Sequence, residues 1–175
     1  MILYLPNAIS LLRIFISPII LFSISKDYLF LTLFLLSIGS LSDFFDGYFA
    51  RKFNVVTKLG ELLDPIADKI FSNTVLWGIY IHGNTPSPLF FLALILSIRD
   101  IVLVLGSIFV ISKKLNFSIS PIYASKICTT LIFLLAFLGI ILGINNLFFE
   151  SITYISLLLV FITMYIYVIN FLKRA

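Results

Sequence analysis

The chain has 175 residues, of which 61% are hydrophobic and only 11% are charged. Soluble domains carry about 25% charged residues, so this composition, with a mean hydropathy of +1.18, excludes an ordinary water-soluble domain. The net charge of +4 comes from basic residues scattered at the ends of apolar segments, which argues against a nucleic-acid-binding face. We therefore expect one all-α, polytopic membrane domain that covers residues 1–175.

Six apolar segments are long enough to cross a bilayer, which takes about 20 residues of helix. The first contains Arg13 and Pro18, and neighbouring helices tolerate such interruptions within a membrane. The sequence therefore predicts six transmembrane helices. They cover residues 8–25, 28–47, 60–82, 89–111, 122–144 and 152–172.

The charges between these segments predict an orientation. One side of the predicted bundle has Lys26 beside Asp27, then His82 and Glu150. The other side collects most of the Lys and Arg, which marks it as cytoplasmic and places both termini there. We expect the N-terminal segment to be retained rather than cleaved, because no basic n-region or cleavage site is present. The cytoplasmic set is Arg51, Lys52, Lys58, Lys113, Lys114, Lys173 and Arg174.

Five of the eight acidic residues, four of them aspartates, lie between positions 43 and 68, at this cytoplasmic side. Asp43 and Asp46 are three residues apart, and Asp64 and Asp68 are four apart, so each pair lies on one face of a helix. Two helices can thus present two carboxylate pairs to each other. Carboxylates are costly near hydrocarbon, and oxygen ligands of this kind suit Mg²⁺. The pattern predicts a divalent-metal site.

The residues around the aspartates suit a phosphate-bearing ligand. Gly47 and Ala50 are small enough for a headgroup to approach the helix backbone, and Gly60 permits a tight entry into the third helix. The N-terminus of that helix favours anions. Arg51 and Lys58 can neutralise phosphate charge.

These residues carry a family resemblance. The run D-F-F-D-G-Y-F-A-R, eight further residues and G-E-L-L-D-P-I-A-D resemble the signature of the CDP-alcohol phosphatidyltransferases. The opening L-P-N-A-I-S-L-L-R, with Asn7 and Arg13, resembles the start of bacterial phosphatidylglycerophosphate synthases and the related cardiolipin synthases. The fixed signature positions are Asp43, Asp46, Gly47, Ala50, Arg51, Gly60, Asp64 and Asp68.

The resemblance implies a reaction in which an alcohol attacks the β-phosphorus of CDP-diacylglycerol and CMP leaves. It implies two Mg²⁺ (or Mn²⁺) ions, a homodimer, and a bacterial inner-membrane enzyme whose active site faces the cytoplasm. Asp68 would act both as a metal ligand and as the general base. The other implied metal ligands are Asp43, Asp46 and Asp64, and the implied CDP-binding residues are Asn7, Gly47, Ala50, Arg51 and Gly60.

The acceptor alcohol depends on the second half of the chain. The N-terminal resemblance favours glycerol 3-phosphate, whose phosphate needs cationic partners, and Arg99, Lys126 and Lys58 are the candidates. The Arg99-Asp100 pair and the single Lys126 resemble the cardiolipin synthases, so phosphatidylglycerol is the alternative acceptor. Arg99 and Asp100 can equally form a structural ion pair between helices, with Lys69 or Lys126 as a further partner.

Three other interpretations stay open. Solvated boundary carboxylates do not explain four aspartates at these spacings. An intramembrane prenyltransferase also uses aspartates and Mg²⁺, but with longer spacings than those found here. An ion-coupled transporter explains buried carboxylates but not Gly47 and Arg51.

The single cysteine, Cys128, excludes an internal disulfide, and we expect it to lie in the core.

Overall fold

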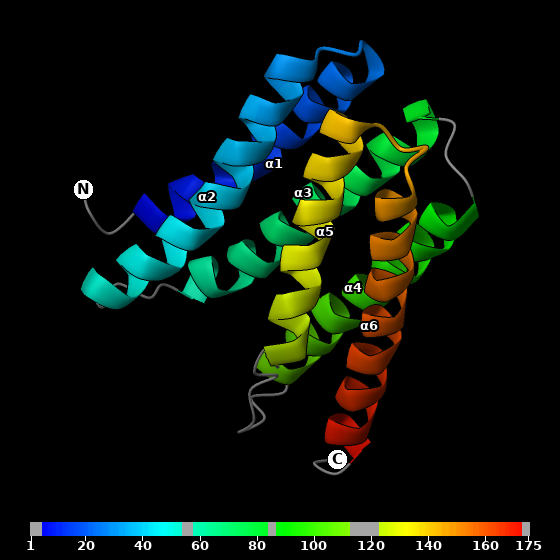
Figure 1. The fold of residues 1–175 in the computed structure, drawn as a ribbon. Helices are drawn as coiled ribbons and strands as arrows, with labels where there is room; N and C mark the ends of the chain where they lie inside the picture. The colour runs from blue at the N-terminus through cyan, green and yellow to red at the C-terminus, as the bar shows by residue number, and fades with distance from the viewer. Residues whose placement is uncertain (1–4, 54–57, 84–86, 113–122, 173–175) are drawn as a thin grey trace. The chain divides into compact units, whose positions relative to one another are not determined.

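A computed structural model describes residues 5–53, 58–83, 87–112 and 123–172, with side chains described for 8–42, 63, 66–83, 88–106, 108 and 127–169. These residues contain six helices and no strand (Figure 1), which confirms the all-α prediction for this part of the chain. The helices are α1 (Leu5–Ser25), α2 (Leu29–Phe53), α3 (Lys58–Gly83), α4 (Ser87–Ser112), α5 (Tyr123–Leu142) and α6 (Leu147–Leu172).

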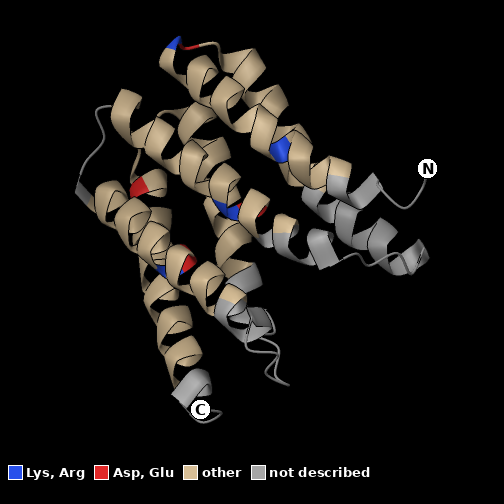
Figure 2. Cartoon of the chain, turned by 180° about the vertical axis from the view of Figure 1, so that it is seen from behind, with Lys and Arg blue, Asp and Glu red and all other residues tan. Residues whose placement is uncertain are grey.

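Three helices are long and apolar enough to cross a membrane, within the described residues. In Figure 2 most of the described ribbon is tan, with few positions coloured as charged residues. The length and the apolar composition of these helices therefore identify the chain as an integral membrane protein. The spanning stretches are Ala8–Ser25, Pro88–Gly106 and Leu147–Ile169, and shorter apolar helical stretches cover Leu29–Ser42 and Ile127–Leu142.

Helix α6 begins five residues before the predicted start at position 152, because Asn146 caps it. The Asn146 side-chain Oδ1 accepts a hydrogen bond from the Phe148 amide at 3.1 Å, and its backbone carbonyl accepts one from the Glu150 amide at 3.1 Å. Glu150, predicted as a loop charge, therefore lies in the first turn of α6, where the helix dipole favours a carboxylate.

The chain divides into two compact units, Met1–His82 and Gly83–Ala175. In the first unit, a tight turn joins α1 to α2. The Tyr28 amide donates to the Ser23 carbonyl at 3.0 Å and the Asp27 amide to the Ile24 carbonyl at 3.1 Å, which is a Schellman motif with Asp27 in the left-handed region at φ 56°. The Tyr28 ring contacts the Phe22 ring edge-to-face, as this cap favours, and the two helices form a hairpin.

Helix α3 packs on both members of that hairpin through glycines. A Cβ added to Gly78 of α3 would lie 3.0 Å from Ile24 Cδ1 and 3.2 Å from Leu21 Cδ1 of α1. On the other helix, Gly39 of α2 lies against the ring of Phe71 of α3. Small residues at helix contacts are typical of membrane proteins, where van der Waals packing holds helices together.

In the second unit, α6 packs on α4 and α5 along a stripe of buried residues spaced three and four apart. Gly139 of α5 admits the Phe149 ring, since an added Cβ would lie 2.6 Å from Phe149 Cε2. Three of the five stripe residues carry hydroxyl groups, and such side chains support helix contacts in lipid. The stripe consists of Phe149, Thr153, Ser156, Val160 and Thr163.

Candidate functional site

The eight signature residues and Lys58 lie on two successive helices. Asp43, Asp46, Gly47, Ala50 and Arg51 fall in the last turns of α2, and Lys58, Gly60, Asp64 and Asp68 fall in the first turns of α3. Of these, Asp68 is the residue whose side chain the structure describes, and the other eight side chains lie outside the described set. Asn7 lies in α1, and its side chain is also outside that set.

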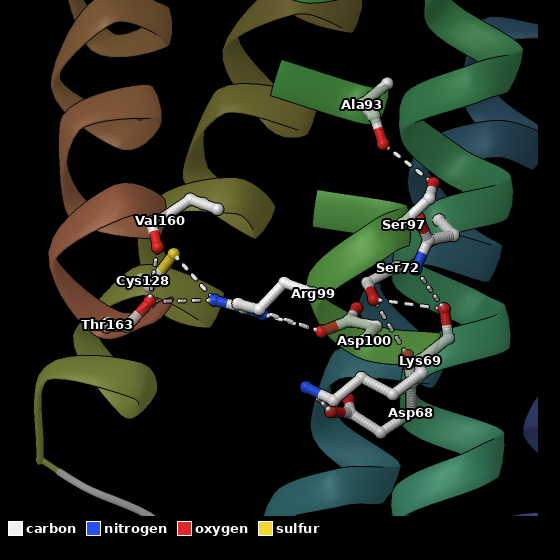
Figure 3. Close-up of polar contacts among 11 residues, drawn as sticks. Asp68, Lys69, Ser72, Ala93, Ser97, Arg99, Asp100, Cys128, Val160 and Thr163 are labelled. Atoms are coloured by element: carbon white, nitrogen blue, oxygen red, sulfur yellow. Dashed lines mark hydrogen bonds and ion pairs between the residues drawn. The ribbon is translucent and has the colours of Figure 1, made fainter. Parts of the chain in front are cut away.

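Asp68 lies between two cationic groups. Its Oδ1 atom is 3.8 Å from Arg13 Nη1, and its Oδ2 atom is 3.6 Å from Lys69 Nζ. The Asp68 side chain keeps 19% of its surface exposed, whereas the Arg13 side chain keeps 1%. Figure 3 shows Asp68 and Lys69 together on α3. The carboxylate is therefore oriented by charge from two helices while part of it stays accessible.

Arg13 is a functional candidate to which the sequence analysis assigned no role. It lies in the middle of α1 with a relative exposure of 0%. A charge at such a position is functional by default and needs a partner, and this was the signal available in the sequence. The identity of that partner, Asp68, came only from the packing of α1 against α3.

The donor set fits a divalent metal by its chemistry. Asp68 offers a partly exposed carboxylate, and Asp43, Asp46 and Asp64 add three more on the same two helices. Such oxygen ligands suit Mg²⁺ and Mn²⁺. Among the residues whose side chains are described, no group of three or more potential metal ligands occurs, so the ligand geometry stays a prediction.

Arg99 and Asp100 form a buried ion pair on α4, with relative exposures of 1% and 3%. Arg99 Nη2 and Nε donate to Asp100 Oδ1 at 2.8 Å and 3.1 Å. The prediction placed this ion pair between helices, whereas the described pair joins neighbouring residues on α4. The Lys69 ammonium forms an ion pair with Asp68 on its own helix, and the Lys126 side chain lies outside the described set.

The guanidinium also connects three helices of the second unit. Arg99 Nη1 lies 3.5 Å from Cys128 Sγ on α5 and 3.3 Å from Thr163 Oγ1 on α6. Thr163 itself donates to the Val160 carbonyl at 2.9 Å, so its oxygen remains able to accept from Arg99. Figure 3 shows Arg99 extending from α4 toward both residues. Cys128 is buried, as predicted.

We call Arg99, Asp100, Cys128 and Thr163 the arginine node. Neither Cys128 nor Thr163 was predicted as a partner of Arg99, because a thiol and a hydroxyl in apolar segments carry no distinctive sequence pattern. The node is compatible with a structural role, since every contact named here lies within the second unit. The alternative role of Arg99 in acceptor binding stays a prediction.

Comparison with known proteins supports the resemblance. The CDP-alcohol phosphatidyltransferase family model matches residues 3–169. A CDP-diacylglycerol–glycerol-3-phosphate 3-phosphatidyltransferase of Aquifex aeolicus is 38% identical over 144 residues, which cover 82% of this chain and 77% of that protein.

Two further relatives match shorter stretches. An enzyme of Rickettsia typhi with the same name is 45% identical over 74 residues, covering 41% of this chain and 42% of that protein. A CDP-diacylglycerol–inositol 3-phosphatidyltransferase of Candida albicans is 40% identical over 74 residues, covering 42% of this chain and 32% of that protein. Because the family model and the Aquifex relative both extend over most of the sequence, the chain belongs to the CDP-alcohol phosphatidyltransferase family and is a membrane transferase of phospholipid biosynthesis.

Proposed function

We propose that the protein transfers the phosphatidyl group of CDP-diacylglycerol to glycerol 3-phosphate, releasing CMP and forming phosphatidylglycerophosphate. The observation that carries the proposal is the placement of all eight fixed signature positions on α2 and α3, whose ends are separated only by residues 54–57. The names of the Aquifex and Rickettsia relatives support this donor and this acceptor.

The donor would bind at the ends of these two helices. Gly47, Ala50 and Gly60 leave room for the cytidine diphosphate near the backbone, and Asn7 contributes from α1. Arg51 and Lys58 offset the diphosphate charge. Asp43, Asp46, Asp64 and Asp68 would hold two Mg²⁺ or Mn²⁺ ions, which when bound neutralise the charge that develops on the departing CMP.

Asp68 would accept the proton of the acceptor hydroxyl, because its carboxylate is oriented and partly exposed. The freed oxygen then attacks the β-phosphorus, the bond from that phosphorus to the bridging oxygen breaks, and CMP leaves with the electron pair. Arg13 holds one carboxylate oxygen of Asp68 from α1 and so orients the base. Arg99, Lys126 and Lys58 are the proposed partners of the acceptor phosphate.

The two units would together form one membrane domain of six spans, with the active site at the cytoplasmic face of the bacterial inner membrane. Three helices that meet the length and hydropathy required for a span support this topology. The Lys and Arg surplus on the side of the aspartates supports the orientation. A homodimer is proposed from the family resemblance alone.

The comparisons favour glycerol 3-phosphate over phosphatidylglycerol, and nothing in them favours a transporter. The Candida relative, however, is named for inositol as the acceptor and is still 40% identical over the aligned residues. Similarity of this extent is therefore compatible with different acceptors. The acceptor must therefore be assayed directly.

The test is transfer by the purified protein in detergent–lipid micelles. CDP-diacylglycerol and Mg²⁺ are supplied with labelled glycerol 3-phosphate, labelled phosphatidylglycerol or labelled inositol, and the lipid products are separated. We expect release of CMP and a labelled lipid with glycerol 3-phosphate alone, and loss of both with a chelator. A product only with phosphatidylglycerol or inositol would replace the acceptor, and no product with any acceptor would refute the proposal.

A further inference from the structure

We propose that the contact between Gly39 and Phe71 sets the register of α2 against α3, and thereby aligns the two aspartate pairs. This inference rests on the proposed function for its consequence, because it assumes that α2 and α3 carry the metal ligands. The contact itself is a property of the described residues of the first unit. In this proposal Gly39 and Phe71 are positioning residues, which act through the helices that carry the aspartates.

The contact leaves no space for a side chain at position 39. A Cβ added to Gly39 would lie 2.5 Å from Phe71 Cε1 and 2.7 Å from Cε2, and closer still to Cζ. The Phe71 side chain is fully buried, with a relative exposure of 0%. The ring therefore lies directly against the backbone of α2, and the obstructing atoms belong to a buried ring rather than to a mobile chain end.

The position of this contact relative to the aspartates gives it a role. Along α2, Gly39 precedes Asp43 by four residues, and along α3, Phe71 follows Asp68 by three. At 1.5 Å per residue these separations are about 6 Å and about 4.5 Å, roughly one turn in each helix. The contact thus lies about one turn from each aspartate pair, and a shift there moves the aspartates directly.

The rest of α3 is held by a separate contact. Gly78, seven residues beyond Phe71, packs against Leu21 and Ile24 of α1. Because seven residues are nearly two helical turns, both contacts lie along one side of α3. A larger residue at position 39 would therefore displace the aspartate-bearing end of α3 while the Gly78 end stays against α1.

Small displacements of the aspartates would be enough to affect metal binding and the reaction rate. Metal ligands must lie within about 0.2 Å of their required distances, and a misplacement of about 1 Å can lower a rate about 100-fold. A glycine within a helix costs about 1 kcal/mol relative to alanine. At position 39 this cost accompanies the close approach of the Phe71 ring to the α2 backbone, which alanine would prevent.

The second unit supplies a matched control. Gly139 of α5 lies against the ring of Phe149 of α6, and an added Cβ would lie 2.6 Å from Phe149 Cε2. Gly139→Ala thus makes the same chemical change against the same kind of ring, on a helix pair that carries no signature residue. General destabilisation by glycine replacement should appear equally in Gly39→Ala and Gly139→Ala.

The first experiment measures register without any activity. In a Cys128→Ser background, a fixed cysteine replaces Ser42 of α2, and a second cysteine replaces Ile66, Ala67 or Ile70 of α3 in turn. We expect the pair that cross-links most strongly to change when Gly39→Ala is added, and to return when Phe71→Leu is added to it. An unchanged cross-linking order in Gly39→Ala would overturn the inference.

The second experiment links register to function in the protein without added cysteines. We expect Gly39→Ala to lower kcat about 100-fold and to weaken Mn²⁺ binding about tenfold. We expect Gly39→Ala/Phe71→Leu to recover part of both and Gly139→Ala to retain both. Equal losses in Gly39→Ala and Gly139→Ala, or no recovery in the double variant, would contradict the inference. An inactive wild-type protein would instead refute the proposed function, and the cross-linking order would still decide the register.

Discussion

At the scale of single residues, the role of general base proposed for Asp68 combines two demands that usually conflict. A base must be accessible to the acceptor, whereas a carboxylate near lipid must be stabilised by cations. The structure meets both demands because Arg13 and Lys69 each approach one oxygen, while 19% of the side chain stays exposed. The arrangement makes separate predictions for the carboxylate and for the arginine.

Asp68→Asn should lose turnover by about 100- to 10,000-fold, which is the usual contribution of a general base. The amide keeps an oxygen that can accept from Arg13, so the fold and the affinity for CDP-diacylglycerol should persist. Binding of the labelled donor and single-turnover rates measure the two effects separately. A variant that turns over at the wild-type rate would remove Asp68 from the mechanism.

Arg13→Ala should lower kcat about 10- to 100-fold, since a residue that orients a ligand or base has an effect of this size. The KM for CDP-diacylglycerol should change little, because Arg13 acts on the base. Arg13→Lys keeps the charge and should recover part of the rate. Steady-state kinetics of the two variants provide the check, and equal loss in both with an increased KM would indicate a direct role in substrate binding.

The arginine node predicts a stability effect in the second unit. Asp100→Asn removes the carboxylate beside the buried Arg99 charge, which should destabilise the unit by about 3–5 kcal/mol. Thr163→Val removes one hydrogen bond to Arg99 and should cost about 1 kcal/mol. Cys128 is buried and is the single cysteine of the chain, so its rate of alkylation by N-ethylmaleimide reports opening of this unit.

We expect alkylation to be slow in the wild type, faster in Thr163→Val and fastest in Asp100→Asn. Alkylation of Asp100→Asn no faster than that of Thr163→Val would show that the carboxylate does not hold the node together. Arg99→Lys adds a functional test of the same node. A raised KM for glycerol 3-phosphate with unchanged alkylation would assign Arg99 to the acceptor.

At the scale of helices, individual hydrogen bonds and backbone conformations define where each helix begins or ends. The α1–α2 turn closes with a Schellman motif at Asp27, and α5 ends before Gly143, which has φ 79°. Asn146 then starts α6 through its side chain. In lipid the backbone N–H and C=O groups inside a helix are satisfied by hydrogen bonds within that helix. Only the backbone groups at the helix ends need other partners, so the side chains there decide where the helix begins or ends.

Asn146→Ala should therefore destabilise the protein by about 1 kcal/mol, the usual effect of losing an N-cap. Asn146→Asp keeps a side-chain oxygen for the Phe148 amide and should stay close to wild type. Thermal unfolding of both variants in the same detergent measures the difference. Equal destabilisation by Ala and Asp would mean that the cap does not stabilise α6.

At the scale of the whole molecule, the structure describes two helical units, and the family match runs across both of them, from residue 3 to residue 169. A single enzyme domain assembled from both units is therefore our proposal. Three helices satisfy the criteria for a span within the described residues, and the proposed topology requires six crossings.

Six crossings would place both termini on one side, which the Lys and Arg surplus predicts to be the cytoplasm, and the segment after His82 on the other side. A green fluorescent protein fused to the C-terminus should fluoresce, and alkaline phosphatase fused there should be inactive. Alkaline phosphatase inserted after His82 should be active, because the predicted loop is on the periplasmic side. An active phosphatase at the C-terminus would contradict the predicted cytoplasmic C-terminus.

The sequence by itself determined the family, the helical class and the number of helical segments. Apolar runs of membrane length and polar breaks are local properties, and the eight signature positions are a fixed-spacing pattern, so both are readable along one chain. Ten of the twelve helix boundaries were predicted within three residues, but α2 continues to Phe53, six residues beyond the predicted end at position 47, and α6 begins five residues before its predicted start. The start of α6 was missed because a cap depends on one hydrogen bond from Asn146 and not on hydropathy.

Only the tertiary structure decided which residues meet. Arg13 and Asp68 are far apart in sequence, as are Arg99, Cys128 and Thr163, and also Gly39 and Phe71. Nothing in a hydrophobic pattern selects one apolar or hydroxyl position over its neighbours as the partner of a given charge or ring. Such pairings follow from how helices approach one another, and close packing around glycines and buried charges decides that approach.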